Sequence, residues 1–201
     1  MPASEKPALD QSAKDKASFR ADAIARRDAL TADERAAGAE IVANRPFPLA
    51  VTADTIVSAY APMRSEFDPY PLMRRLADAG ASLALPVVQA RGQPLAIRAY
   101  AFGDDLNSGI WGIREPKPEA PEVFPDIMLV PLTAFDRKGH RIGYGAGYYD
   151  RTIVRVRANK PMIAIGLAFA TQEIERVPAT VFDAPLDLVL TEREVIDFRG
   201  S

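Results

Sequence analysis

Residues 127–151 are IMLVPLTAFDRKGHRIGYGAGYYDR, and this stretch decides the fold. The short apolar run at residues 127–132 predicts a buried strand, and the pattern from residue 147 to about residue 157 predicts a helix. Three glycines at alternate positions, within residues 143–147, lie between these two segments. A glycine-rich connection from a strand to a helix is where ligands bind to open parallel sheets.

The same alternation of strands and helices extends outward in both directions. Thr31 and Glu34 form a capping-box pattern, Asp68 is followed by a proline that favours a helix start, and Gly80 favours its end. Short buried strands alternating with helices are typical of a mostly parallel sheet. We therefore predict an α/β fold, a three-layer sandwich with helices on both faces of the sheet. Strands are predicted at residues 55–61, 82–88, 95–101, 127–132, 162–168 and 186–190, helices at residues 14–30, 31–43, 68–80 and 147–157, and a proline-rich loop at residues 111–125.

Length and composition limit the class of protein. The chain has 201 residues, a net charge of −2, one histidine and no cysteine. We expect a polar, mobile tail at residues 1–13 and a single domain at residues 14–201. Disulfides, thiolate metal sites and histidine-rich zinc sites are excluded, so any metal would be a hard cation such as Mg²⁺. We expect no nucleic-acid or membrane partner, a cytoplasmic location because no signal peptide is evident, and a monomer.

The glycine-rich stretch has the chemistry of a phosphate site. Gly143, Gly145 and Gly147 leave backbone N–H groups unobstructed, and the following helix adds partial positive charge. Arg141 can bind a phosphate through two hydrogen bonds, and Asp150 can reach a magnesium ion that bridges phosphate oxygens. The spacing matches neither the P-loop nor the dinucleotide fingerprint. A tight turn that needs glycine for positive φ is the alternative interpretation of the glycines.

Several motifs together resemble one known family, the 5-formyltetrahydrofolate cyclo-ligases, also called methenyltetrahydrofolate synthetases. Residues 135–151 are similar to the family pattern F-D-x-x-G-x-R-(L/I)-G-x-G-x-G-(Y/F)-Y-D-R at every fixed position. Residues 112–116 (GIREP) resemble its G-I-x-E-P, and residues 16–20 (KASFR) resemble its K-x-x-(L/F)-R. Glu66 after a strand, and residues 186–192 (LDLVLTE), complete a resemblance that covers roughly residues 14–197.

The resemblance implies an activity. It is the ATP- and Mg²⁺-dependent closure of 5-formyltetrahydrofolate to 5,10-methenyltetrahydrofolate, with release of ADP and phosphate through a phosphorylated formyl intermediate. The enzyme then mainly positions two ligands and neutralises phosphate charge.

The resemblance also implies roles for particular residues. The metal ligands would be Asp150 and Asp187, and Glu66 would bind folate together with Tyr144 and Tyr148. Arg141 and Tyr148 would act at the reacting centre. From the residues alone, other interpretations remain open. Lys16 and Arg20 could lie on a solvated helix face, Glu66 could be a helix-start acid, and Asp187 could be a strand-end or turn carboxylate. The implied ATP contacts are Lys16, Arg20, Arg141, Gly143, Tyr144, Gly145, Ala146, Gly147, Tyr148 and Tyr149.

Three features of the stretch depart from the pattern or have no assigned role. Tyr144 and Ala146 occupy positions where some relatives carry basic residues, so ATP or folate binding is expected to be weaker if those residues touch phosphate. His140 lies in the same loop, and we assign it no role. Two other functions stay open: a phosphotransferase with another acceptor, and a non-catalytic folate- or nucleotide-binding paralogue.

Overall fold

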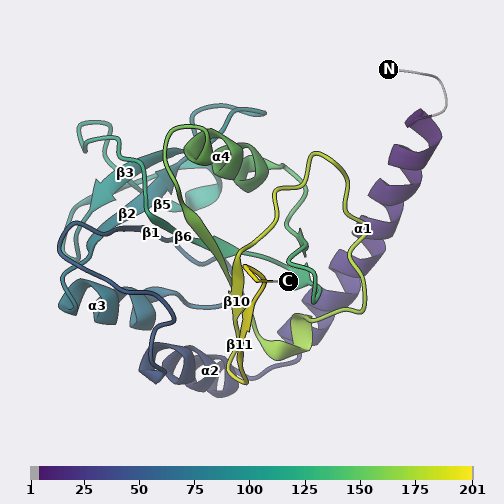
Figure 1. Cartoon of the computed structure of the whole chain (residues 1–201), viewed down its shortest axis with the longest axis horizontal. Helices are drawn as coiled ribbons and strands as arrows, with labels where there is room; N and C mark the ends of the chain where they lie inside the picture. Colours follow the sequence, from purple (N-terminus) through teal and green to yellow (C-terminus); the bar gives the residue numbers. More distant parts are fainter. Residues whose placement is uncertain (1–4, 201) are drawn as a thin grey trace.

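The computed structural model describes residues 5–200, without the side chains of residues 5–12 and 111. Seven strands within this range form one sheet in the order β11-β10-β9-β6-β1-β2-β3 (Figure 1). The five central strands are parallel, and the edge strands β11 and β3 are antiparallel to their neighbours. The strands are β1 (Ile56–Ser58), β2 (Ser82–Val87), β3 (Ala96–Tyr100), β6 (Ile127–Pro131), β9 (Ile163–Leu167), β10 (Leu188–Leu190) and β11 (Val195–Asp197).

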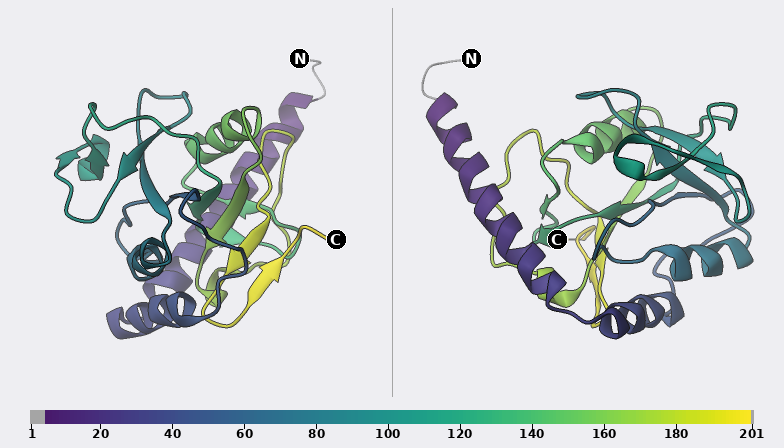
Figure 2. Two further views of the ribbon diagram at one scale, coloured as in Figure 1. Left: turned by 60° about the vertical axis from the view of Figure 1, so that its left-hand side comes forward. Right: turned by 180° about the vertical axis from the view of Figure 1, so that it is seen from behind.

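Helices cover both faces of this sheet. Figures 1 and 2 show α2 (Ala32–Asn44) and α3 (Tyr70–Asp78) on one face and α4 (Tyr148–Arg157) on the other. Strand β6 shows why, because its side chains alternate between the faces. Ile127 and Leu129 join the core beneath α2 and α3, whereas Met128 and Val130 join the core beneath α4. The predicted three-layer α/β fold is confirmed.

The expected elements are present, with changes at their ends. Each of the six predicted strands corresponds to a strand of the sheet, and the capping box of Thr31 and Glu34 begins α2. The first helix, α1 (Glu5–Asp28), begins before the expected start at Lys14. Residues 5–13 are therefore helical. Pro7 is compatible with this, because it lies in the first turn, where its missing N–H is not needed. Residues 1–4 lie outside the described residues.

Sequence patterns did not reveal the short strands. The edge strand β11 has three residues, and the region predicted as a proline-rich loop instead contains β5 (Arg114–Pro116), which pairs with β4 (Leu106–Ser108). A short 3₁₀ helix, Ile110–Gly112, joins them, and another spans Ala170–Gln172. A further small hairpin pairs β7 (Ala134–Phe135) with β8 (Arg141–Ile142). No helix in the described part of the chain is long and apolar enough to cross a membrane.

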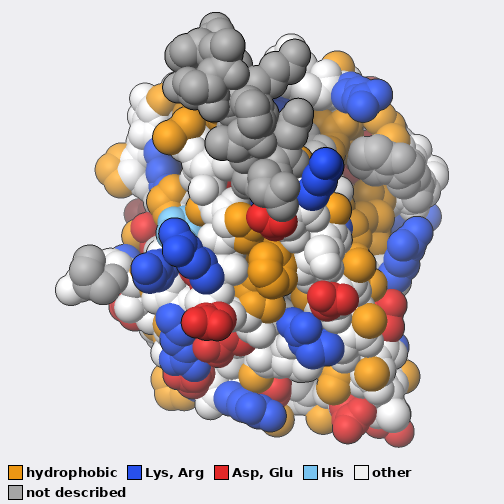
Figure 3. All heavy atoms as spheres, turned by 90° about the vertical axis from the view of Figure 1, so that its right-hand side faces the viewer, with side chains coloured by type: hydrophobic (Ala, Val, Ile, Leu, Met, Phe, Trp, Pro, Cys, Tyr) orange, Lys and Arg blue, Asp and Glu red, His pale blue; other side chains and the backbone are white. Residues whose placement is uncertain are grey.

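Helix α1 stands apart from the helices that cover the sheet. Figure 2 shows it running obliquely along one side of the molecule. It packs through Ala23 against Ala134 and Ile142 of the β7–β8 hairpin. On the face shown in Figure 3, basic and acidic side chains are intermixed, so positive charge is not gathered into one stripe there. The contact with the hairpin brings α1 beside the glycine-rich stretch.

Candidate active site

A cavity of about 500 Å³ lies at the carboxyl ends of the central strands. Its walls include Tyr60 just after β1, Val88 just after β2 and Pro131 at the end of β6. From β1 the chain continues to β2 on one side of the sheet, and from β6 it continues to β9 on the other side. The cavity therefore lies at the topological switch point, where open α/β sheets bind ligands.

The glycine-rich loop, residues 143–147, forms one wall between β8 and α4. Gly145 has φ +97° and Gly147 has φ +66°, so both occupy the left-handed region that favours glycine. Gly143 has no such φ, and a β-carbon there would meet nothing within 4 Å. The turn therefore accounts for two of the glycines, whereas the protein itself does not require the third.

Asp136 holds the base of this loop. Its buried carboxylate accepts hydrogen bonds from the backbone N–H of Lys138 at 2.9 Å, His140 at 3.0 Å and Val177 at 3.0 Å. Burial alone would raise the pKa of Asp136, but these donors outweigh it and hold the pKa below its ordinary value. The His140 ring lies 3.2 Å from the same carboxylate. Asp136 is thus a structural anchor, and His140 is its neighbour.

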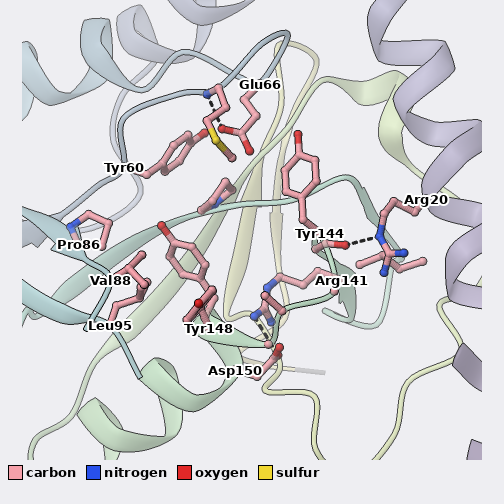
Figure 4. Close-up of a pocket in the computed structure, with 18 of the residues that line it drawn as sticks. Arg20, Tyr60, Glu66, Pro86, Val88, Leu95, Arg141, Tyr144, Tyr148 and Asp150 are labelled. Atoms are coloured by element: carbon pink, nitrogen blue, oxygen red, sulfur yellow. Dashed lines mark hydrogen bonds and ion pairs between the residues drawn. The ribbon is translucent and has the colours of Figure 1, made fainter. Parts of the chain in front are cut away.

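Arg141 and Asp150 are joined across the loop. The buried Arg141 guanidinium donates through Nη1 to the Ala184 carbonyl at 2.7 Å and through Nη2 to Asp150 Oδ1 at 2.9 Å. The Ala184 N–H donates to the same Asp150 oxygen at 3.1 Å. Both side chains line the cavity (Figure 4). The guanidinium keeps three further N–H groups for a ligand, since two of its five are used.

Helix α1 brings two more cations to the same end of the cavity. Arg20 Nε donates to the Gly143 carbonyl at 2.7 Å, and burial lowers the pKa of Arg20. Lys16, one turn earlier, forms a 2.6 Å ion pair with Asp183. Both side chains line the cavity, as the i, i+4 spacing predicted. The Lys16 charge is already matched by a carboxylate, whereas Arg20 contacts the loop backbone.

Glu66 lies at a different part of the cavity wall. It is 8% exposed, and its Oε2 accepts a 2.7 Å hydrogen bond from the Met63 N–H. Burial raises the pKa of Glu66, opposed by the Met63 N–H, the charge of Arg27 and the Tyr144 hydroxyl. Figure 4 shows the Tyr144 side chain extending toward Glu66. Tyr144 thus joins the glycine-rich loop to the acidic part of the cavity.

Two buried charged residues were not assigned a role from the sequence. Arg27 donates from Nε to Ser65 Oγ at 3.0 Å and from Nη2 to the Tyr144 hydroxyl at 2.9 Å. It follows Arg26 on α1, so spacing alone did not separate the buried arginine from its exposed neighbour. Glu115, from the GIREP motif, also lines the cavity. That motif was the available signal for Glu115.

Asp187 is not brought to the cavity with Asp150. It immediately precedes β10, at the amino end of a parallel strand, whereas the cavity lies at the carboxyl ends of β1, β2 and β6. Its carboxylate forms a 2.6 Å ion pair with Arg157 and accepts a 2.6 Å hydrogen bond from the Ala164 N–H. Of the two predicted metal ligands, the structure places Asp150 at the cavity and Asp187 away from it. The other predicted site residues all line the cavity.

Figure 4 shows two unlike ends of this cavity. Arg20, Arg141 and the glycine-rich loop form a cationic end, which suits phosphates. Pro86, Val88 and Leu95 form an apolar end, which suits a flat ring system. The fold and the cavity together define an α/β protein whose ligand cavity has a cationic end beside an apolar one.

Comparisons with known proteins all point to one enzyme family. The model of the 5-formyltetrahydrofolate cyclo-ligase family matches residues 12–192. The 5-formyltetrahydrofolate cyclo-ligase of Escherichia coli K12 is 33% identical over 85% of this chain and 96% of its own length. That of Mycolicibacterium smegmatis is 36% identical over 70% of this chain and 75% of its own. The NMR structure of Aquifex aeolicus 5,10-methenyltetrahydrofolate synthetase covers 92% of this chain and 94% of its own, with a TM-score of 0.78 and 30% identity.

The chain belongs to the 5-formyltetrahydrofolate cyclo-ligase family. The resemblance indicated by the sequence motifs is confirmed, and so are the enzyme class, a ligase, and its place in folate one-carbon chemistry.

Proposed function

We propose that the chain closes 5-formyltetrahydrofolate to 5,10-methenyltetrahydrofolate at the expense of ATP. The observation that carries this proposal is the single cavity with a cationic end and an apolar end. A triphosphate at the cationic end and a folate ring system at the apolar end would bring the γ-phosphorus near the formyl oxygen. Positioning of this kind is the main source of rate enhancement in phosphoryl transfer.

The proposed reaction has two steps. The formyl oxygen attacks the γ-phosphorus and ADP leaves, which gives a phosphorylated iminium at the formyl carbon. The N10 nitrogen then attacks this carbon, loses its proton and expels inorganic phosphate. The first step turns a poor leaving group into a good one. The products are 5,10-methenyltetrahydrofolate, ADP and phosphate.

The cationic end supplies the groups that hold the phosphates in this proposal. Arg141 is the catalytic residue, since its position is held by Ala184 and Asp150 before any ligand binds. Arg20 and Lys16 add positive charge from α1. The backbone N–H groups of residues 143–149, which include Tyr144, Ala146 and Tyr149, complete the proposed phosphate site. Gly143 is consistent with this assignment, because the open space beside it leaves a ligand room to approach the backbone. Fixed donors of this kind stabilise developing negative charge.

In this proposal the apolar end holds the folate ring system, and Glu66 and Tyr144 lie on one wall of the cavity. Figure 4 shows the Tyr148 ring between the apolar residues and Arg141. This is the position from which a ring can stack on the substrate near the reacting carbon. We therefore propose Tyr148 as the second catalytic residue and Glu66 as a folate ligand.

Magnesium fits this cavity in a limited way. Among the described residues, no group of three or more acidic or histidine side chains is close enough to hold a metal by itself. Asp150 lines the cavity, and only its Oδ1 is used by Arg141 and Ala184. Mg²⁺ commonly binds one or two carboxylates together with substrate phosphates and water. We propose that Asp150 contacts Mg²⁺, which supplies charge neutralisation at the phosphates when bound.

One assay tests the proposal. Purified protein is incubated with 5-formyltetrahydrofolate, ATP and Mg²⁺, and methenyltetrahydrofolate is followed by its absorbance while phosphate release is measured. We expect product only in the complete mixture, with one phosphate per product. ATP consumption with another acceptor alone would favour the phosphotransferase, and binding of both ligands without turnover would favour the non-catalytic paralogue. We also propose a cytoplasmic monomer, to be checked by cell fractionation and light scattering.

A further inference from the structure

Glu115 is a buried carboxylate on the cavity wall whose hydrogen bonding is incomplete. It is 7% exposed, and its Oε1 accepts one hydrogen bond, 3.3 Å long, from the Val88 N–H. Charge-assisted hydrogen bonds are usually 2.7–2.9 Å long, so this contact is weak. No Lys or Arg side chain of the described residues forms an ion pair with it. A buried charge in this state is costly unless a ligand satisfies it.

The fold holds this carboxylate in place. A β-carbon on Gly109 would come within 2.2–2.6 Å of the Glu115 carboxyl atoms, so the carboxylate packs directly against the backbone at this glycine. Gly109 and Glu115 belong to the β4–β5 unit, in which the Gly109 N–H bonds to the Ile113 carbonyl at 2.7 Å. The carboxylate is therefore packed against backbone on one side and faces the cavity on the other.

Comparison with Glu66 separates the two acidic residues. Glu66 accepts a 2.7 Å hydrogen bond and has the Tyr144 hydroxyl and the Arg27 charge beside it. Glu115 has neither a short hydrogen bond nor a neighbouring cation to offset its burial, and burial raises its pKa. Of the two, Glu115 is the carboxylate with unused acceptor capacity. A ligand that offers two adjacent N–H donors would fill it.

The surroundings of Glu115 select the kind of ligand. Val88, whose N–H contacts Glu115, belongs to the apolar end with Pro86 and Leu95 (Figure 4). A flat ring can lie between these residues and present its edge to the carboxylate. The 2-amino-4-oxopyrimidine edge of folate has an N3–H beside an amino group, two donors that match one carboxylate. Adenine has an acceptor nitrogen beside its amino group, so it makes a poorer match.

We infer that Glu115 binds the pyrimidine edge of the folate ring system, accepting hydrogen bonds from the 2-amino group and from N3–H. The inference rests on the proposed function. It gives the GIREP motif a role in substrate specificity: Glu115 sets how the ring enters. It also places the ring edge at the apolar end, with the formyl group directed toward Tyr148 and the cationic end.

The test measures binding by calorimetry without ATP, so no reaction occurs. Wild type, Glu115→Gln and the matched control Glu119→Gln are titrated with 5-formyltetrahydrofolate and with its analogue carrying a methyl group in place of the 2-amino group. Glu119 is an exposed acid in the turn that follows β5. We expect Glu115→Gln to bind 5-formyltetrahydrofolate at least about tenfold more weakly, to lose distinctly less affinity for the analogue, which keeps only the N3–H donor, and to bind ATP normally.

Equal weakening for both folates, or no weakening for either, overturns the inference. If Glu115→Gln does not fold, as its melting temperature would show, Glu115→Asp is used. The supporting result is then a smaller loss of affinity that is greater for the amino-bearing ligand than for the analogue. Failure of the proposed function is a separate outcome. In that case, wild type makes no methenyltetrahydrofolate with ATP and Mg²⁺, whatever Glu115 binds.

Discussion

The two ends of the cavity differ in how their charges are satisfied. At the cationic end, Arg141, Arg20 and Lys16 each already contact a carbonyl or a carboxylate of the protein. Away from the cationic end, the cavity wall contains two buried carboxylates, Glu66 and Glu115. Burial raises the pKa of each. The positive charges are thus positioned in advance, whereas the negative charges depend more on what binds.

This difference suggests how the enzyme distinguishes its two ligands. Cations held by protein acceptors remain oriented without a ligand and need no reorganisation when a phosphate arrives. A buried carboxylate with a weak hydrogen bond, as at Glu115, favours a ligand that brings N–H donors. A phosphate would be repelled by Glu66 and Glu115, and a neutral ring would gain little at the cationic end. Orientation of the two substrates would follow from electrostatics before shape is considered.

The largest expected effect comes from Arg141→Met. Its loss removes a fixed phosphate donor and leaves Asp150 without its cation. We expect kcat/KM for ATP to fall by about 10³-fold. The free energy of unfolding should fall by about 2–3 kcal/mol, less than for a fully buried pair, because the Asp150 side chain is 23% exposed. Steady-state kinetics and urea unfolding measure the two effects.

The matched control for Arg141 is Arg176→Met, which removes an exposed arginine outside the cavity. It should leave both quantities near wild type. If Arg141→Met lost stability but kept its ATP kinetics, Arg141 would be a structural residue and the cationic end would need another phosphate ligand.

The next effect concerns Glu66 and pH. Because burial raises the pKa of Glu66, the ionised form needed to accept ligand hydrogen bonds is complete only above that raised value. In wild type, kcat/KM for the folate should therefore decline as pH falls from neutral into the acid range, beginning at a higher pH than an ordinary glutamate would give. Glu66→Gln should lower the high-pH value by about 10- to 100-fold and weaken this dependence.

The acidic limb should not vanish in Glu66→Gln, since Glu115 also has a raised pKa. Repeating the profile in Glu66→Gln with Glu115→Gln separates the two contributions. A wild-type profile that is flat across this range would mean that neither carboxylate must be ionised for folate to bind.

A smaller contrast lies within the cationic end itself. Arg20→Ala should raise the KM for ATP by about tenfold, since Arg20 contacts the loop that binds phosphate. Lys16→Ala should raise it by less than about threefold, since the Lys16 charge is already paired with Asp183. Initial rates at varied ATP test this order. Equal losses would show that ATP draws Lys16 away from Asp183.

Sequence reasoning reached the parts of this molecule that depend on local pattern. Residues 127–151 predicted a strand, a loop and a helix in the right order, because apolar runs and glycines act over short distances. The edge strand β11 was missed, because its three residues carry no apolar run and form a strand only by pairing with β10. The start of α1 was placed too late, because a polar segment with prolines resembles a tail.

For the site, the residues of the glycine-rich stretch were predicted together with Lys16, Arg20 and Glu66, which family motifs pointed out, whereas Arg27 lies in no such motif and was missed. Arg27 is buried only because Ser65 and Tyr144 fold around it, which no spacing on α1 reveals. Asp187 shows a limit of the family resemblance. The resemblance implied a metal-ligand role for Asp187, whereas the residue precedes its parallel strand and so lies at the amino end of the sheet, away from the cavity.

The smallest effect on activity is expected from Asp187→Asn, which tests directly whether Asp187 takes part in binding Mg²⁺. The Mg²⁺ concentration for half-maximal rate should stay within about twofold of wild type, whereas Asp150→Asn should raise it about tenfold. Stability should fall by about 1 kcal/mol, because Arg157 loses its ionic partner while Asn still accepts from the Ala164 N–H. Rates at varied Mg²⁺, with melting temperatures, distinguish the two variants. If Asp187→Asn shifted the Mg²⁺ requirement as much as Asp150→Asn, the Arg157 pair would have to open when ligands bind. The two carboxylates would then belong to one metal site after all.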